Sequence, residues 1–145
     1  MPFVDPVEVE RRLEQLQNVC RSAGLRMTHQ RMEIFREIAR TNQHPDAETI
    51  LKQVRERLPT TSHDTVYRTL ASLEEMGLVS RIDPLDGRAR FDANCDKHHH
   101  FICTTCGCIS DIYLNDDISL PNDVEDLGSV ESLYLQVRGV CHNCT

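Results

Sequence analysis

Residues 62–91 read SHDTVYRTLASLEEMGLVSRIDPLDGRARF, and this stretch decides the fold. Its first half predicts a helix over residues 65–76, because Ser62 or Asp64 can cap the start and Gly77 can end it. The apolar residues at helical spacing, which are expected to face the core, are Val66, Leu70 and Leu73. The residues on the opposite face are Thr65, Tyr67, Arg68 and Thr69. The pattern therefore predicts an amphipathic helix with a polar outer face.

The second half of the stretch has the pattern of a β-hairpin. Residues 78–82 predict one strand, residues 83–87 a turn, and residues 88–91 the returning strand. The arginines of this hairpin are Arg81, Arg88 and Arg90. Helices followed by a basic hairpin are typical of a winged helix, whose recognition helix enters the major groove while the arginines contact phosphates. Ordinary solvated arginines on a small helical domain are the alternative, and the hairpin favours DNA binding.

Three further helices are predicted upstream. Residues 7–23 form the first, which ends before Gly24; Thr28 can cap the second, and Asp46 the third, which runs up to Pro59. The apolar residues expected in the core are Val9, Leu13, Leu16 and Cys20 in the first helix, Met32, Phe35 and Ile38 in the second, and Ile50, Leu51, Val54 and Leu58 in the third.

Charge and composition change along the 145 residues. Residues 1–90 carry 14 Lys/Arg and 14 Asp/Glu, whereas residues 91–145 carry 2 and 9, which accounts for the net charge of −7. DNA contacts must therefore come from the first part, while the acidic second part attracts cations. The boundary is expected near residues 91–96. The second part has short apolar alternations that predict strands at residues 101–102, 109–113 and 133–140.

The chain has no signal peptide and no apolar run of about 18 residues, so we expect a soluble cytoplasmic protein without a membrane partner.

The seven cysteines indicate metal binding. Four cysteines form two CxxC pairs separated by 34 residues, Cys103 with Cys106 and Cys141 with Cys144. Two such knuckles complete a closed tetrahedral site suited to structural Zn²⁺. Redox-active or idle pairs are the alternative, and Cys108 is a candidate substitute ligand.

A second group of metal-binding side chains precedes the first knuckle. In an extended chain His98 and His100 point to one face and His99 to the other. Asp92 and Asp111 flank them closely enough for both carboxylates to converge on the same ion. Such mixed ligands suit Fe²⁺, Mn²⁺ or Zn²⁺. On the residues alone, a solvated strand face explains the histidines equally well.

The order of these motifs resembles the ferric uptake regulator family from about Leu16 to Cys144. The motifs are LRMTHQR at 25–31, HP at 44–45, TVYRTL at 65–70, GLV at 77–79, RFD at 90–92, HHHFIC at 98–103 and the two CxxC pairs. The resemblance implies an α+β protein, with a winged-helix DNA-binding domain over residues 1–91 and a small α/β dimerisation domain with a four-cysteine zinc site over residues 92–145. It also implies a homodimer that binds palindromic operators on double-stranded DNA when metal is bound.

By the same resemblance, a regulatory Fe²⁺ or Mn²⁺ site lies between the two domains. Its implied ligands are His44, Asp92, His98, His100 and Asp111. Iron-sensing members usually have Glu at the positions of Asp92 and Asp111, whereas the peroxide-sensing branch has Asp. The chain is therefore expected to sense hydrogen peroxide: Fe²⁺ reacts with peroxide, His44 or His98 is oxidised, and DNA is released, while the Mn²⁺ form ignores peroxide.

Other functions fit the sequence less well. An iron-responsive or zinc-responsive repressor of metal-uptake genes is the nearest alternative. A metal-dependent hydrolase would need a general base and a substrate pocket, which the sequence does not indicate, so we do not expect an enzyme. A plain zinc-ribbon interaction module would leave the winged helix and His44 unexplained. The stretch 129–137 lacks the His-His pair that builds an accessory metal site in many members.

Overall fold

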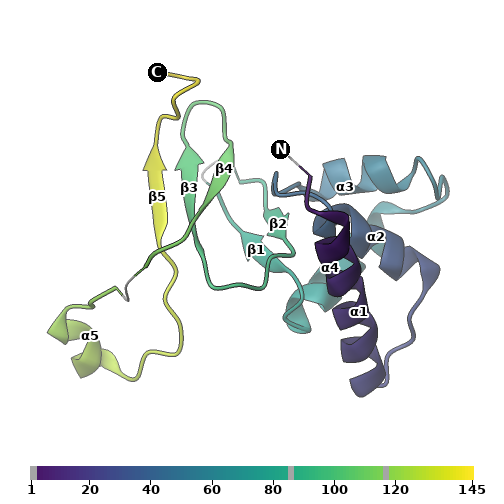
Figure 1. Cartoon of the computed structure of the whole chain (residues 1–145), viewed down its shortest axis with the longest axis horizontal. Helices are drawn as coiled ribbons and strands as arrows, with labels where there is room; N and C mark the ends of the chain where they lie inside the picture. The colour runs from purple at the N-terminus through teal and green to yellow at the C-terminus, as the bar shows by residue number, and fades with distance from the viewer. Residues whose placement is uncertain (1–2, 85–86, 116–117) are drawn as a thin grey trace. The chain divides into compact units, whose positions relative to one another are not determined.

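The computed structural model describes residues 3–84, 87–115 and 118–145, and these form two compact units (Figure 1). The N-terminal unit extends to Cys95 and the C-terminal unit begins at Asp96. The sequence predicts a boundary near residues 91–96, with the first domain ending at residue 91. In the described part of the chain, no helix has the length and apolar character needed to cross a membrane.

The N-terminal unit consists of four helices followed by a two-stranded antiparallel sheet. The elements are α1 (Pro6–Ser22), α2 (His29–Ala39), α3 (Ala47–Val54), α4 (His63–Glu75), β1 (Ser80–Ile82) and β2 (Arg90–Asp92). This order of helices and a terminal hairpin confirms the predicted winged helix.

Side-chain caps fix where the helices of this unit begin. Thr28 Oγ1 accepts the Arg31 N–H at 3.1 Å, and Ser62 Oγ accepts the Thr65 N–H at 3.1 Å. Ser62 is thus the cap of α4, and Asp64 lies within the helix. Such a cap satisfies a backbone donor that has no partner inside the helix.

The cap of α3 is a carboxylate with a shifted pKa. Asp46 Oδ1 accepts the Thr49 N–H at 2.8 Å. Burial by itself raises the pKa of Asp46, but hydrogen bonds from Thr49 and the nearby Arg90 and Arg88 guanidinium groups lower it below the usual 3.8. The side chain is therefore a charged cap at the positive end of the helix.

The core of the N-terminal unit is built from the predicted apolar faces. Leu16, Ile38, Ile50 and Leu73 are completely buried, and the other predicted residues are buried or partly buried against them. One boundary was wrong. α3 ends at Val54 and does not run to Pro59, because the Glu56 and Arg57 N–H groups donate only three residues back, to the Gln53 and Val54 carbonyls, and the chain continues as turns.

The hairpin has shorter strands than the sequence predicted. Its register pairs Ser80 with Asp92, Arg81 with Phe91 and Ile82 with Arg90. Leu85 and Asp86 of the predicted turn lie outside the described residues. Phe91 also donates its N–H to the Pro45 carbonyl at 3.0 Å, so β2 is tied to the segment that leads into α3.

The C-terminal unit is a three-stranded sheet with one short helix. β3 (His99–Cys103) lies between β4 (Ile109–Ile112), which is antiparallel to it, and β5 (Gln136–Gly139), which is parallel (Figure 1). α5 (Asn122–Leu127) has no buried residue. The large apolar side chains that this unit leaves exposed are Tyr113, Leu114, Leu120, Leu127, Val130, Tyr134, Leu135, Val137 and Val140.

Candidate metal centres and nucleic-acid interface

The two CxxC pairs meet at the ends of β3 and β5. Cys103 ends β3, and the turn that follows is closed by the Gly107 N–H, which donates to the Cys103 carbonyl at 2.9 Å. The Thr104 N–H donates to the Gly139 carbonyl at 2.8 Å at the end of β5. A side chain at Gly139 would meet the Phe101 ring at 3.1 Å, so glycine allows this close pairing. The strands thereby bring the second pair to the first.

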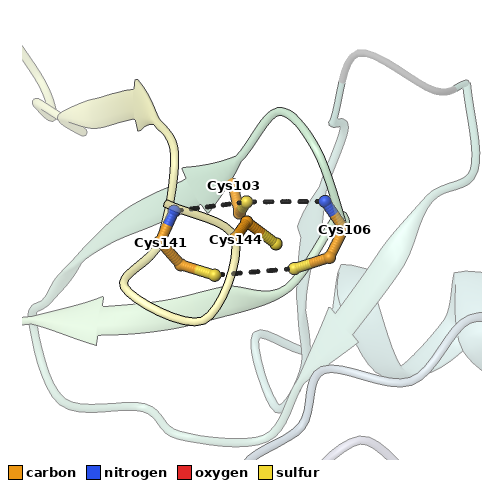
Figure 2. A group of neighbouring side chains, drawn as sticks. All are labelled: Cys103, Cys106, Cys141 and Cys144. Atoms are coloured by element: carbon orange, nitrogen blue, oxygen red, sulfur yellow. Dashed lines mark hydrogen bonds between the residues drawn. The ribbon is translucent and has the colours of Figure 1, made fainter.

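Four sulfur atoms converge in this region (Figure 2). One Sγ from each of Cys103, Cys106, Cys141 and Cys144 lies within 4.8 Å of the others, and the Sγ atoms of Cys106 and Cys141 are 3.8 Å apart. The backbone N–H groups of Cys106 and Cys141 both donate to Cys103 Sγ at 3.4 Å. The cluster has the ligand number and donor type of a closed tetrahedral thiolate site.

The hydrogen bonds in this cluster favour a thiolate at Cys103 and a protonated thiol at Cys144. The donation from the Cys106 and Cys141 N–H groups lowers the pKa of Cys103 to about 5. A hydrogen bond with Cys141 raises the pKa of Cys144 to about 12, because this thiol keeps its proton beside its neighbours' negative charge. A divalent cation would replace such shared protons, and metal binding would therefore release protons.

The N-terminal unit carries one imidazole beside one carboxylate. His44 Nε2 lies 3.4 Å from Asp92 Oδ2, and both side chains are almost fully buried. His44 precedes Pro45 and has φ +55°, the one non-glycine residue with positive φ in the described ranges. Asp92 ends β2, and its Oδ1 accepts the Asn94 N–H at 2.9 Å. Asp92 is thus oriented by its local backbone, while His44 lies in a backbone conformation that is rare for residues other than glycine.

The C-terminal unit carries two imidazoles beside one carboxylate. His100 and Asp111 are direct partners in the β3–β4 register. Asp111 Oδ1 lies 3.5 Å from His98 Nε2 and 3.6 Å from His100 Nε2. His98 Nδ1 lies 2.5 Å from the Asp96 carbonyl, so Nδ1 is the donor of this hydrogen bond and Nε2 is the nitrogen that faces Asp111. The predicted alternation holds even though β3 begins at His99.

His99 points away from this group and has a structural contact. Its Nδ1 accepts the Leu135 N–H at 2.9 Å, which anchors the segment before β5. Tyr113 is a neighbour that the sequence analysis did not single out. Its ring stacks on His98 with centroids 5.7 Å apart. The sequence contains a signal for this contact: Tyr113 follows Asp111 by two positions, and an extended chain repeats its side-chain direction every two residues, which places both on one face.

The predicted DNA face of α4 is largely accessible. Tyr67 is 52% exposed and Arg68 is exposed, while Thr65 and Thr69 are half-buried. His63, at the first turn, stacks on Tyr67 and lies 3.3 Å from Glu48 of α3. The helix therefore presents polar side chains along one side while its apolar side packs in the core.

The three hairpin arginines differ from one another. Arg81 and Arg88 are exposed, with Arg81 Nε 3.0 Å from Asp83 and Arg88 Nη1 3.8 Å from Asp46. Arg90 is half-buried and donates to the backbone carbonyls of residues 43 and 44. Exposed guanidinium groups in weak surface ion pairs can exchange their partners for phosphates, so Arg81 and Arg88 are able to bind the phosphates of DNA.

A winged helix followed by a unit that carries thiolate and imidazole–carboxylate clusters defines a class of metal-responsive DNA-binding proteins. The model of the ferric uptake regulator family matches residues 22–128. Ferric uptake regulation protein 1 of Mycolicibacterium fortuitum is 43% identical over 97 residues, which cover 65% of this chain and 58% of that protein. The peroxide-responsive repressor PerR of Staphylococcus epidermidis is 32% identical over 139 residues, which cover 94% of this chain and 92% of that one.

The fold leads to the same family. The structure of the Helicobacter pylori ferric uptake regulator, described as having three functional metal-binding sites, matches with a TM-score of 0.73 and 25% identity. The match covers 99% of this chain and 97% of that one. The chain belongs to the ferric uptake regulator family, whose members are metal-responsive transcriptional regulators that bind DNA and form dimers.

Proposed function

We propose that this protein is a transcriptional repressor that senses hydrogen peroxide through Fe²⁺-catalysed oxidation of a ligand histidine. The observation that carries the proposal is the chemistry of the two half-sites, in which both carboxylates are aspartates, Asp92 beside His44 and Asp111 beside His98 and His100. Aspartate at both positions is the pattern of the peroxide-sensing branch. The likeness to peroxide-responsive repressors over nearly the whole chain supports the same branch.

The four-cysteine cluster is proposed to hold structural Zn²⁺. Cys103, Cys106, Cys141 and Cys144 supply four sulfur donors, which fill the tetrahedral coordination that Zn²⁺ prefers. A filled shell leaves no position for substrate or peroxide chemistry. The ion would therefore join the end of β5 to the end of β3.

The two half-sites are proposed to bind a single Fe²⁺ or Mn²⁺ ion together. His44 and Asp92 supply one imidazole and one carboxylate, and the C-terminal unit supplies two imidazoles and the Asp111 carboxylate, a donor set that suits these metals. Asp92 and His98 are six positions apart, so a fully extended chain keeps their Cα atoms within about 20 Å. An ion that binds both halves favours the geometry in which they are close.

Release of DNA would follow from loss of a ligand. An Fe²⁺ ion held by these residues would supply the redox chemistry that activates hydrogen peroxide beside the histidines, with no net change in the ion. One imidazole C–H and one hydrogen peroxide then yield an oxygenated imidazole and one water. The hydrogen bond from His98 Nδ1 to the Asp96 carbonyl orients Nε2 toward Asp111. Oxidation of this ring would therefore remove a metal ligand that is already oriented. The metal would no longer favour the DNA-binding geometry.

DNA binding is proposed to use α4 and the hairpin of a homodimer on a palindromic operator. The proposed contacts are Thr65, Tyr67, Arg68 and Thr69 on α4, with Arg81 and Arg88 on the hairpin. Arg90, predicted with them, is left out because it donates to the Gln43 and His44 carbonyls. A dimer with two-fold symmetry contacts the two halves of a palindromic operator, each with one recognition helix. A single C-terminal unit leaves apolar side chains exposed, among them Leu127 at 87% and Tyr134 at 76%. Their exposure supports burial against a second copy of the chain in the dimer.

The test is operator binding followed by fluorescence anisotropy. A labelled inverted-repeat duplex is first selected from random DNA with the Mn²⁺-loaded protein. The Fe²⁺-loaded protein is expected to lose the duplex after brief exposure to low peroxide, while the Mn²⁺-loaded protein keeps it. Arg68→Ala should weaken binding, whereas Lys52→Ala, which removes an exposed base on α3, should not. Retained binding by the Fe²⁺ form would instead support a reversible iron-responsive or zinc-responsive repressor.

A further inference from the structure

Arg90 lies on the hairpin but binds the backbone of the segment that carries His44. Its Nε donates to the His44 carbonyl, and its Nη2 donates to the Gln43 carbonyl at 3.0 Å. The guanidinium group is planar and holds its donors in a fixed fork, so two adjacent carbonyls restrain it in one orientation. These contacts cross 46 and 47 positions of sequence.

The segment that Arg90 binds has an unusual conformation. His44 has φ +55°, which residues other than glycine seldom adopt and which persists only where the surrounding structure holds it. A backbone bridge also ties the same segment to β2: Asp46 pairs with Arg90, and the Phe91 N–H donates to the Pro45 carbonyl at 3.0 Å within this bridge. The strand thus provides the surroundings that maintain the His44 conformation.

The same strand also carries the partner of the His44 side chain. Arg90 and Asp92 are two positions apart on β2. Arg90 binds the His44 carbonyl, while Asp92 Oδ2 lies 3.4 Å from His44 Nε2. One strand therefore restrains both the backbone of His44 and the direction of its imidazole.

We propose that Arg90 is the positioning residue of the His44–Asp92 half-site: it holds His44 in its left-handed conformation and thereby sets the affinity for the regulatory metal. The inference rests on the proposed function, because it takes His44 and Asp92 as ligands. It also separates Arg90 from the other hairpin arginines, since a guanidinium group bound to two carbonyls is not available to phosphate.

The experiment measures Mn²⁺ binding to the zinc-loaded, full-length protein, with free Mn²⁺ followed by electron paramagnetic resonance. Arg90→Ala is expected to weaken Mn²⁺ binding by about 10–100-fold, the usual effect of removing a group that orients a metal ligand. Arg90→Lys can reach one carbonyl but cannot reproduce the fork, so its Mn²⁺ affinity is expected to lie between those of the wild type and Arg90→Ala. Arg21→Ala, which removes an exposed arginine from α1, is the matched control and should bind as wild type does.

A second readout separates positioning from DNA contact. At saturating Mn²⁺, Arg90→Ala should keep the wild-type dependence of operator affinity on salt, whereas Arg68→Ala should lower the slope by about 1 for each protomer. Wild-type Mn²⁺ affinity in Arg90→Ala, or a reduced salt slope in it, would overturn the inference. If Arg90→Ala does not fold, the same two outcomes in Arg90→Lys decide it. If Asp92→Asn binds Mn²⁺ as tightly as wild type, the proposed regulatory site itself fails, and this inference fails with it.

Discussion

Replacing Cys144 by Ser is expected to release β5 from β3 without unfolding the N-terminal unit. β5 pairs with β3 at four register positions, and three of its four residues are exposed, so burial within the chain contributes little to holding it. Net stabilisation from its backbone hydrogen bonds is about 1 kcal/mol each. The strand is therefore held mainly by these few bonds and by the four-cysteine cluster.

The contribution of the cluster can be worked out from the loop that it closes. The two CxxC pairs are separated by 34 residues, and a cross-link that closes a loop of this length contributes about 4 kcal/mol through chain entropy. The cross-link and the β3–β5 hydrogen bonds therefore stabilise the position of β5 by similar amounts, and the substitution removes the contribution of the cross-link. Protection of the β5 amides is expected to fall by up to about 10³-fold, since 1.4 kcal/mol corresponds to a factor of ten.

Hydrogen exchange followed by mass spectrometry measures this protection, and zinc content is measured in the same samples. Peptides from β5 should exchange faster in Cys144→Ser, while peptides from α1 and α2 should exchange as in wild type. Cys95→Ser, which removes an exposed thiol of the N-terminal unit, serves as the control. Wild-type exchange of β5 in a zinc-free Cys144→Ser protein would refute the reasoning.

Three further predictions concern the N-terminal unit. Leu16→Ala should lower the free energy of unfolding by about 2–5 kcal/mol in urea titrations, because Leu16 is completely buried, whereas Val7→Ala at an exposed position should change it little. Ser62→Ala should lower stability by about 1 kcal/mol and weaken operator binding, because it removes the cap of α4. The lowered pKa of Asp46 means that its stabilisation is present above pH 3.8 and is lost as the pH falls through its folded pKa. Acid titrations that show the same low-pH loss in Asp46→Asn as in wild type would contradict this last prediction.

The features that the sequence predicted well depend on local rules. Thr28 and Ser62 cap their helices, and the side-chain period of two along an extended chain brings His98 and His100 toward Asp111. These rules involve residues that are neighbours in sequence or on one strand, so the pattern alone contains them. The order of the family motifs added His44 and Asp92, which are far apart in sequence.

The features that the sequence did not predict depend on contacts between distant residues. The end of α3 at Val54 is set by competing turn hydrogen bonds, while the apolar period continues to Leu58. Arg90 was grouped with the exposed hairpin arginines, because no local pattern indicates that carbonyls 46 and 47 positions away will bind it. The left-handed conformation of His44 likewise has no signal in a His-Pro pair.

The central claim, oxidation of a ligand histidine, is tested most directly by intact and peptide mass spectrometry. The Fe²⁺-loaded and Mn²⁺-loaded proteins are exposed to low peroxide in parallel and digested. We predict a gain of one oxygen on the peptide that contains His44 or His98 in the Fe²⁺ sample and none in the Mn²⁺ sample. Unmodified histidines in the Fe²⁺ sample, or equal oxidation with both metals, would contradict the account.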